Sequence, residues 1–210
     1  ARTDENLLPL AQVNRILAQV LRDEGERVGY YGPVEGFEPL RAQIVARTLE
    51  SGAECTLRET VITSGAMEAL HIALRGVTRP GDTVAIASPT YYCFLQMLEV
   101  LGLRVIEVPS RPGEGVRPPD IAQVTERFRV AACVLTPNFN NPDGALTPDR
   151  AKAEIVDIQA RRGVPLIEDD VYADLHYGPA RPASCKAYDT RGMVLTCSSF
   201  SKTIAPGYRV

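Results

Sequence analysis

The sequence predicts an α/β domain in which helices cover both faces of a mostly parallel sheet, a three-layer α/β/α fold. From residue 60 onward, short apolar runs rich in β-branched residues alternate with segments of helical periodicity. Such alternation is typical of βαβ units with right-handed crossovers. The 210 residues, 45% of them hydrophobic, are enough to build one large core.

Two helices are expected before the first strand. Residues 7–24 carry apolar side chains at helical spacing, and residues 37–50 form a second helix for which Gly52 is the expected stop. Glycines and tyrosines at residues 29–33 separate the two helices. Six strands follow, at residues 60–63, 83–87, 104–108, 131–135, 165–167 and 193–196. Residues 109–119, with four prolines and two glycines, are expected to form a surface loop.

Composition and charge exclude several classes of protein. The net charge of −3 gives no basic excess for binding a phosphate backbone, so these residues are not expected to contact nucleic acid. Five cysteines without a CxxC pair indicate reduced thiols rather than disulfides or a zinc site, and no metal is expected. No apolar run approaches membrane-spanning length, and residues 1–10 do not resemble a secretory signal. A cytoplasmic protein is therefore expected.

Residues that follow the strands are the first candidates for a site, because ligands of parallel sheets bind beyond the carboxyl ends of the strands. Ser64, Gly65 and Ala66 follow the first expected strand and open a helix, which is typical of a phosphate cup. Ser64 could equally be a simple N-cap. Tyr91 follows the second strand and could stack on a planar cofactor.

Two further segments carry polar side chains at strand ends. Asn141 lies in a turn dense in amides, although Asn-Pro with a following glycine is also ordinary turn chemistry. Residues 168–170 are three consecutive acids at the end of a buried strand, which is costly unless a cation meets them. A metal ion and a protonated ring nitrogen are both candidates for that cation.

Lys202 follows the last strand and carries the strongest chemical signal. It lies among small hydroxyl residues, with Arg209 seven residues further on, so an amine nucleophile is combined with donors for a phosphate. The chain holds three lysines, and the other two, Lys152 and Lys186, are expected to be solvated charges.

Five motifs in this order resemble the fold type I, pyridoxal-phosphate-dependent aminotransferase superfamily of class I and II. They are Tyr31-Gly32-Pro33, Thr63-Ser64-Gly65-Ala66, Asn141-Pro142-Asp143-Gly144, Asp169-Asp170-Val171-Tyr172 and Ser199-Phe200-Ser201-Lys202 with Arg209. The subfamily that the chain most resembles is the aminotransferase-like domain of MocR/GntR-type transcription regulators. The Tyr91-Tyr92 pair and residues 8–15 and 197–202 suggest that group.

The resemblance implies pyridoxal 5'-phosphate as cofactor and a role for each site residue. Lys202 would form the internal aldimine and act as acid and base, Asp169 would pair with the pyridine nitrogen, and Tyr172 would assist catalysis. Tyr91 would stack on the ring, and Asn141 and Tyr172 would hydrogen-bond the ring hydroxyl. The phosphate would be bound by Ser64, Gly65, Ala66, Ser199 and Arg209. Relatives also often carry cis bonds at the turns matching Ser88-Pro89 and Asn141-Pro142.

The resemblance also implies a homodimer, since Tyr31 would reach the phosphate of the neighbouring subunit. Residues 1–36 would form an N-terminal helix and dimer-contact segment, and residues 37–210 the cofactor-binding large domain, truncated before the C-terminal small domain. The expected function is to react with an amino acid or amine by aminotransferase-type chemistry, as the effector-sensing part of a regulator. A free-standing aminotransferase is the alternative. The intact cofactor residues argue against a remnant that binds no cofactor.

Overall fold

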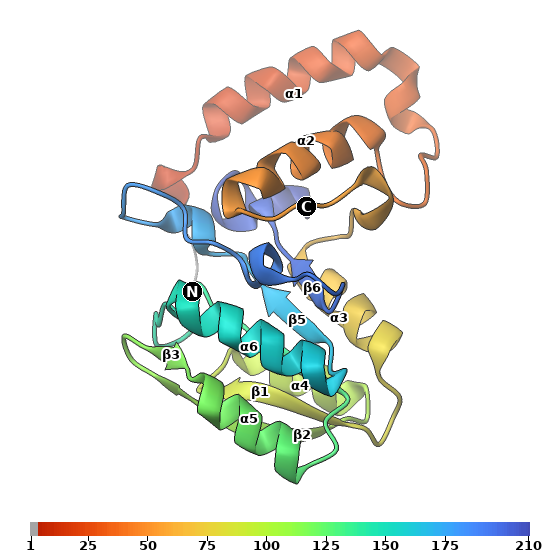
Figure 1. The fold of residues 1–210 in the computed structure, drawn as a ribbon. Coiled ribbons are helices and arrows are strands. Elements are labelled where there is room, and N and C mark those ends of the chain that lie inside the picture. The colour runs from red at the N-terminus through yellow and green to blue at the C-terminus, as the bar shows by residue number, and fades with distance from the viewer. Residues whose placement is uncertain (1–3) are drawn as a thin grey trace.

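The computed structural model describes residues 4–210, which form a single six-stranded sheet with helices on both faces (Figure 1). The strand order is β3-β2-β1-β4-β5-β6. Five strands are parallel, and the short β3 pairs antiparallel with β2 at one edge. The strands are β1 (Thr83–Ser88), β2 (Arg104–Arg111), β3 (Gly115–Val116), β4 (Ala132–Leu135), β5 (Leu166–Asp169) and β6 (Val194–Cys197).

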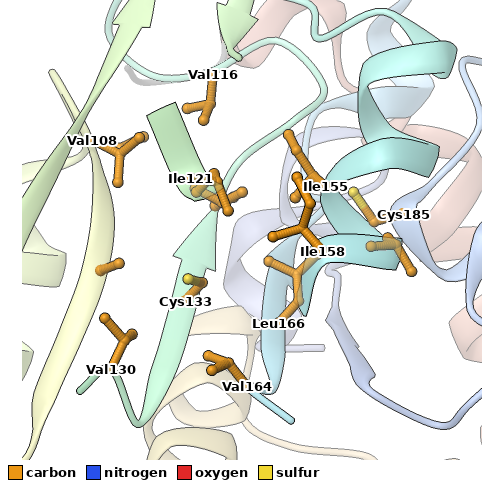
Figure 2. Packing of buried hydrophobic residues seen from close by; sticks show 14 of the residues in the cluster. Val108, Val116, Ile121, Val130, Cys133, Ile155, Ile158, Val164, Leu166 and Cys185 are labelled. Carbon is orange, nitrogen blue, oxygen red and sulfur yellow. The ribbon is translucent and has the colours of Figure 1, made fainter. Parts of the chain in front are cut away.

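Helices α5 (Pro118–Arg127) and α6 (Asp149–Arg162) cover one face of the sheet. Helices α3 (Ala66–Val77) and α4 (Tyr92–Val100) cover the other, so the expected three-layer α/β/α fold is confirmed. Figure 2 shows the core beneath α5 and α6, where Ile121 and Ile155 face Cys133 and Leu166 of the sheet. Because strand side chains alternate, Ile167 belongs to the second core, under α3 and α4.

The N-terminal helices lie at one end of the domain. Helix α1 (Leu10–Glu24) and helix α2 (Glu38–Thr48) confirm the two expected helices, and neither contains a fully buried residue. Gly52 ends the short 3₁₀ turn that follows α2, with a left-handed φ of 75°. A hydrogen bond of 3.1 Å from the Tyr208 hydroxyl to Asn14 Oδ1 ties α1 to the C-terminal segment. The domain division at residue 36 stays a prediction, and residues 1–3 lie outside the described part.

Short 3₁₀ helices connect these elements, at Glu5–Leu7, Gly25–Gly29, Leu49–Ser51, Leu57–Glu59, Ala173–Leu175, Cys185–Tyr188, Phe200–Lys202 and Pro206–Tyr208. Both Ser88-Pro89 and Asn141-Pro142 are cis, as expected. Among residues 4–210, no helix is long and apolar enough to cross a membrane.

Two expectations about the segments between elements are wrong. Residues 60–63 form no strand, because their backbone joins no ladder; Ile62 N–H instead donates to the Glu35 carbonyl at 2.9 Å. Residues 109–119 are not simply a surface loop. They contain the end of β2, all of β3 and the start of α5, and Val116 lies in the core.

The expectation that Lys152 and Lys186 are solvated is also wrong. Lys152 is completely buried, and its Nζ donates to Asp149 Oδ1 at 3.1 Å and to the Ala183 carbonyl at 2.8 Å. Lys186 donates to Asp189 Oδ2 at 2.8 Å and to the Val194 carbonyl at 3.1 Å. A distant loop supplies the carbonyl partner of Lys152, and the start of β6 supplies that of Lys186. These hydrogen bonds compensate the lost hydration of both ammonium groups.

Candidate functional site

A pocket of about 260 Å³ lies where the parallel strands end. Loops after β1, β4, β5 and β6 form its walls together with the first turns of α3. It is lined by Ala66, Met67, Leu70, Tyr91, Asn141, Asp169, Val171, Tyr172, Ser199, Ser201, Lys202 and Arg209. The structure therefore brings together eight of the residues that the sequence analysis singled out, although up to 143 positions separate them along the chain.

Asp169 is the acid that faces this pocket. The residue is buried, and its Oδ1 has no hydrogen-bond partner among residues 4–210. Burial raises the pKa of Asp169 to about 7, with a further rise from the charge of Asp170, while Lys202 acts in the opposite direction. A buried carboxylate oxygen without a donor is costly, and a cationic N–H placed in the pocket would satisfy it.

The two acids beside Asp169 have partners elsewhere. Glu168 accepts hydrogen bonds from Cys185 N at 2.6 Å and from Thr196 Oγ1 at 3.1 Å. Asp170 is paired with Asn138 Nδ2 at 2.8 Å and with Arg181. Residues 4–210 contain no group of three or more His, Cys, Asp or Glu that could hold a metal ion. A ring nitrogen therefore fits Asp169 better than the metal alternative does.

Lys202, Tyr172 and Asn141 line the same pocket as Asp169. Lys202 Nζ is 5.9 Å from the centre of the Tyr172 ring. Asn141 Nδ2 donates to the Tyr172 hydroxyl at 3.3 Å. Burial raises the pKa of Tyr172, so the hydroxyl stays protonated at neutral pH and can donate a hydrogen bond.

The turn that opens α3, together with Arg209, is suited to bind an anion and is called the anion site. Gly65 is the N-cap of α3, with a φ of 91°, so free N–H groups and the positive end of the helix dipole face this point. Arg209 Nη2 donates to the Ser64 carbonyl at 3.0 Å, which places the guanidinium beside the same turn. Ser199 Oγ accepts from Ser201 N at 3.1 Å. The alternative that Ser64 is the N-cap is wrong, because Gly65 occupies that position.

Replacing Gly65 with alanine is expected to weaken anion binding at the anion site. A Cβ at residue 65 would lie 2.6 Å from Arg209 Nη2, and the positive φ disfavours any side chain. We expect Gly65→Ala to weaken binding of inorganic phosphate or a phosphorylated ligand by about tenfold or more. Isothermal titration calorimetry measures this. Gly81→Ala is the matched control, since Gly81 has the same φ of 91° with open space around its Cβ.

Tyr91 lines the pocket, and its ring packs edge-on against Tyr92 and Phe94, with centroid distances of 4.9 and 5.9 Å. Tyr31 is fully exposed and does not line the pocket of its own chain. Its expected contact with a neighbouring subunit stays a prediction.

Four lining residues had no role in the sequence analysis: Met67, Leu70, Val171 and Ser201. Met67 and Leu70 share one face of α3, three residues apart, and the helical spacing of apolar residues gave no sign that this face meets the strand ends. Ser201 lies one residue before Lys202, and that position is the signal in the sequence that could have found it.

Known proteins with similar sequences match this chain from end to end. The model of the family described as aminotransferase class I and II matches residues 2–210. The uncharacterized HTH-type transcriptional regulator YjiR of Escherichia coli is 36% identical over 222 residues, covering 100% of this chain and 47% of that protein. The 2-aminoadipate transaminase of Thermus thermophilus is 33% identical over 210 residues, covering 97% of this chain and 51% of that enzyme.

Solved structures of aminotransferases are also similar to this chain. The α-aminoadipate aminotransferase LysN of Thermus thermophilus, in complex with N-(5'-phosphopyridoxyl)-L-leucine, superposes with a TM-score of 0.89 and 31% identity, covering 99% of this chain and 53% of LysN. An archaeal alanine:glyoxylate aminotransferase gives a TM-score of 0.91 and 27% identity, with 99% and 52% coverage. The chain thus spans about half the length of the relatives it matches.

Proposed function

This chain belongs to the class I and II aminotransferase family, and from that premise we propose that its pocket binds pyridoxal 5'-phosphate and reacts with an amino acid or amine. One observation carries the proposal: the unpartnered Asp169 Oδ1 lies in the same pocket as Lys202 and Arg209. A carboxylate, the anion site and a primary amine at one pocket match the ring nitrogen, the phosphate and the aldehyde of that cofactor.

The residues present fit the cofactor at each point. Ala66, Ser199 and Arg209 line the pocket and would hold the phosphate. Ser64 and Gly65 do not line it, but they would contribute from the turn beside Arg209. Tyr91 would stack on the ring, while Asn141 and Tyr172 would hydrogen-bond the ring hydroxyl. Asp169 would accept from the ring nitrogen, and Lys202 would hold the aldehyde carbon through Nζ.

When bound, pyridoxal phosphate would supply an electron sink that stabilises negative charge at the carbon next to the substrate's amino group. Asp169 would hold a proton on the ring nitrogen, since a carboxylate in a dry site favours the protonated ring. Lys202 Nζ would accept the proton of the substrate carbon and return it. Tyr172 would orient the hydroxyl end of the ring, and Asn141 donates to the Tyr172 hydroxyl at 3.3 Å.

The simplest test is to add pyridoxal phosphate to the full-length protein, reduce it with borohydride and map the labelled peptide. We expect the label on Lys202. A label on Lys152 or Lys186, or no label, would contradict the assignment. Lys152 provides an internal control, because it is completely buried and its amine already has two partners.

We propose further that the parent protein is a regulator of the MocR/GntR type, in which this domain senses an amino acid or amine. Support comes from YjiR and from YdcR of Escherichia coli, a second uncharacterized HTH-type regulator that is 40% identical over 208 residues. The 33% identity to 2-aminoadipate transaminase supports the alternative, a free-standing aminotransferase acting between an amino acid and a 2-oxo acid.

A direct comparison separates these two roles. A regulator is expected to change its affinity for DNA upstream of its gene when an amino acid or amine is added, with little turnover. An aminotransferase instead converts the amino acid to a 2-oxo acid over many cycles and binds no DNA. DNA affinity and 2-oxo acid formation, measured on the same full-length preparation, decide between them.

A homodimer is proposed as the working assembly. The apolar residues of α1, among them Ile16, Val20 and Leu21, are exposed on a helix that buries none of its side chains. Exposed apolar stripes of this kind mark interaction surfaces. Tyr31, fully exposed beyond α1, would then reach the partner's phosphate site. Sedimentation analysis of the full-length protein, with Tyr31→Phe compared for cofactor affinity, tests both statements.

A further inference from the structure

Arg181 joins the acidic segment after β5 to helix α2. Its Nη2 donates to Asp170 Oδ2, and its Nε donates to Asp174 Oδ1 at 2.9 Å. A third bond runs from Nη1 to the Pro182 carbonyl at 3.2 Å. Arg47 of α2 donates to the other oxygen of Asp174 at 2.6 Å. The side chains of Arg181 and Asp170 are 13% and 2% exposed, so their ion pair is shielded from water.

The partners of Asp170 are those of an ionised carboxylate. Asn138 Nδ2 donates to one oxygen at 2.8 Å, and Arg181 donates to the other. A guanidinium keeps its proton in proteins, so its partner carries the negative charge. Burial raises the pKa of Asp170, and the ion pair with Arg181 opposes that rise. Without Arg181, this charge would be buried with the Asn138 amide as its remaining side-chain donor.

The charge of Asp170 acts on the pocket through its neighbour. Asp169 and Asp170 are adjacent, so their side chains point to opposite sides of the chain, Asp169 into the pocket and Asp170 toward Arg181. After burial, the charge of Asp170 is the next cause of the raised pKa of Asp169. A change in the ionisation of Asp170 is therefore transmitted to whatever Asp169 faces.

We propose that Arg181 is a positioning residue: it holds Asp170 ionised, paired and turned away from the pocket, so that Asp169 is the carboxylate that meets the ring nitrogen of the cofactor. This inference rests on the proposed function and extends it to a residue outside the pocket lining. Asp174 and Arg47 fix the guanidinium in turn, which gives Arg181 one orientation.

Several ionisable groups face Asp170, and Arg181 is the cation that forms an ion pair with it. The others lie on β5, on the segment that follows it and on the 3₁₀ helix at 185–188, and are Glu168, Asp169, Asp174 and Cys185. Removing Arg181 therefore leaves Asp170 without its ion-pair partner in a cluster with the buried carboxyl groups of Glu168 and Asp169. In such a cluster, the pKa of Asp170 must rise further above its unfolded value.

The first measurement is the thermal stability of the cofactor-free, full-length protein at two pH values. Because the folded-state pKa of Asp170 is raised in Arg181→Met, this residue costs the variant stability as pH increases. The Tm of Arg181→Met should therefore be about 6 °C or more below that of wild type at about pH 8, and much closer to it at about pH 5. Asp170→Asn in the Arg181→Met background should remove this pH dependence. Arg111→Met is the matched control. Asp120, its partner, keeps Arg117, so its deficit should be similar at both pH values.

The second measurement is a pH titration of the visible absorbance of bound pyridoxal phosphate. Arg181→Met should add a second pH-dependent step, from Asp170, that wild type and the Arg181→Met/Asp170→Asn double variant lack. If Arg181 acted through packing alone, Asp170→Asn would not remove the effects of Arg181→Met. An equal loss of stability at both pH values in Arg181→Met, or an absorbance titration with a single step in that variant, overturns this inference and leaves the proposed function standing. A wild type that takes up no pyridoxal phosphate overturns the proposed function, and this inference with it.

Discussion

Replacing Lys202 with arginine is expected to abolish the borohydride-stable attachment of pyridoxal phosphate completely. Arginine keeps the positive charge and most of the length, but it carries no primary amine that can bond to the aldehyde carbon. Among the residues that line the pocket, Lys202 is the single lysine. Visible absorbance and mass spectrometry of the reduced protein measure the loss, and amino-group transfer should fall below detection.

The matched control is Lys186→Arg, the same substitution at a lysine outside the pocket. Lys186 donates to Asp189 and to the Val194 carbonyl, bonds that an arginine can also make. The label should remain at the wild-type level in this variant. Residual, reversible binding of pyridoxal phosphate to Lys202→Arg is compatible with the assignment, because the anion site at Gly65 and Arg209 is unchanged. A full label in Lys202→Arg would refute it.

Local sequence patterns predicted the strands that carry the pocket, but they also predicted one strand that does not form and missed the shortest strand, β3. The runs that became β1, β4 and β6 are apolar over most of their length, and β5 begins with two apolar residues. Strands β1, β4 and β5 are buried on both faces. Residues 60–63 have the same β-branched composition, but composition does not supply a neighbouring strand. The antiparallel β3 is only two residues long and follows a turn rich in proline and glycine, so no periodicity marked it.

The pocket residues were predictable for a related reason, whereas their partners were not. Parallel strands bring their carboxyl ends to one edge, so residues that follow them meet without any detailed packing information. The partners of buried charges come from loops whose path no local pattern records. Lys152 looked solvated because its acceptor, the Ala183 carbonyl, lies 31 residues away along the chain. The pairing of Asp170 with Arg181 was not predictable for the same reason, because these residues lie 11 positions apart along the chain.

Replacing Asp169 with asparagine is expected to slow amino-group transfer by about 10- to 100-fold while leaving the borohydride label on Lys202 in place. Asparagine keeps the shape but removes the negative charge that faces the ring nitrogen, so the bound ring loses the proton that makes it an electron sink. Rates of half-reactions with a panel of amino acids and amines, followed by absorbance, measure the effect.

The stability of the cofactor-free Asp169→Asn protein provides an independent check with the opposite sign. Burial raises the pKa of Asp169 from 3.8 to about 7, so the folded state binds a proton that the unfolded state has released. Wild type therefore loses stability as pH rises from about 4 to about 7, and Asp169→Asn should escape this loss and become the more stable protein above that range.

Asp170→Asn is the control and should behave in the opposite way. It breaks the buried ion pair with Arg181 and destabilises the fold, while it changes the transfer rate less than Asp169→Asn does. If thermal unfolding and transfer rates move together in the two variants, Asp169 is not the carboxylate that faces the ring.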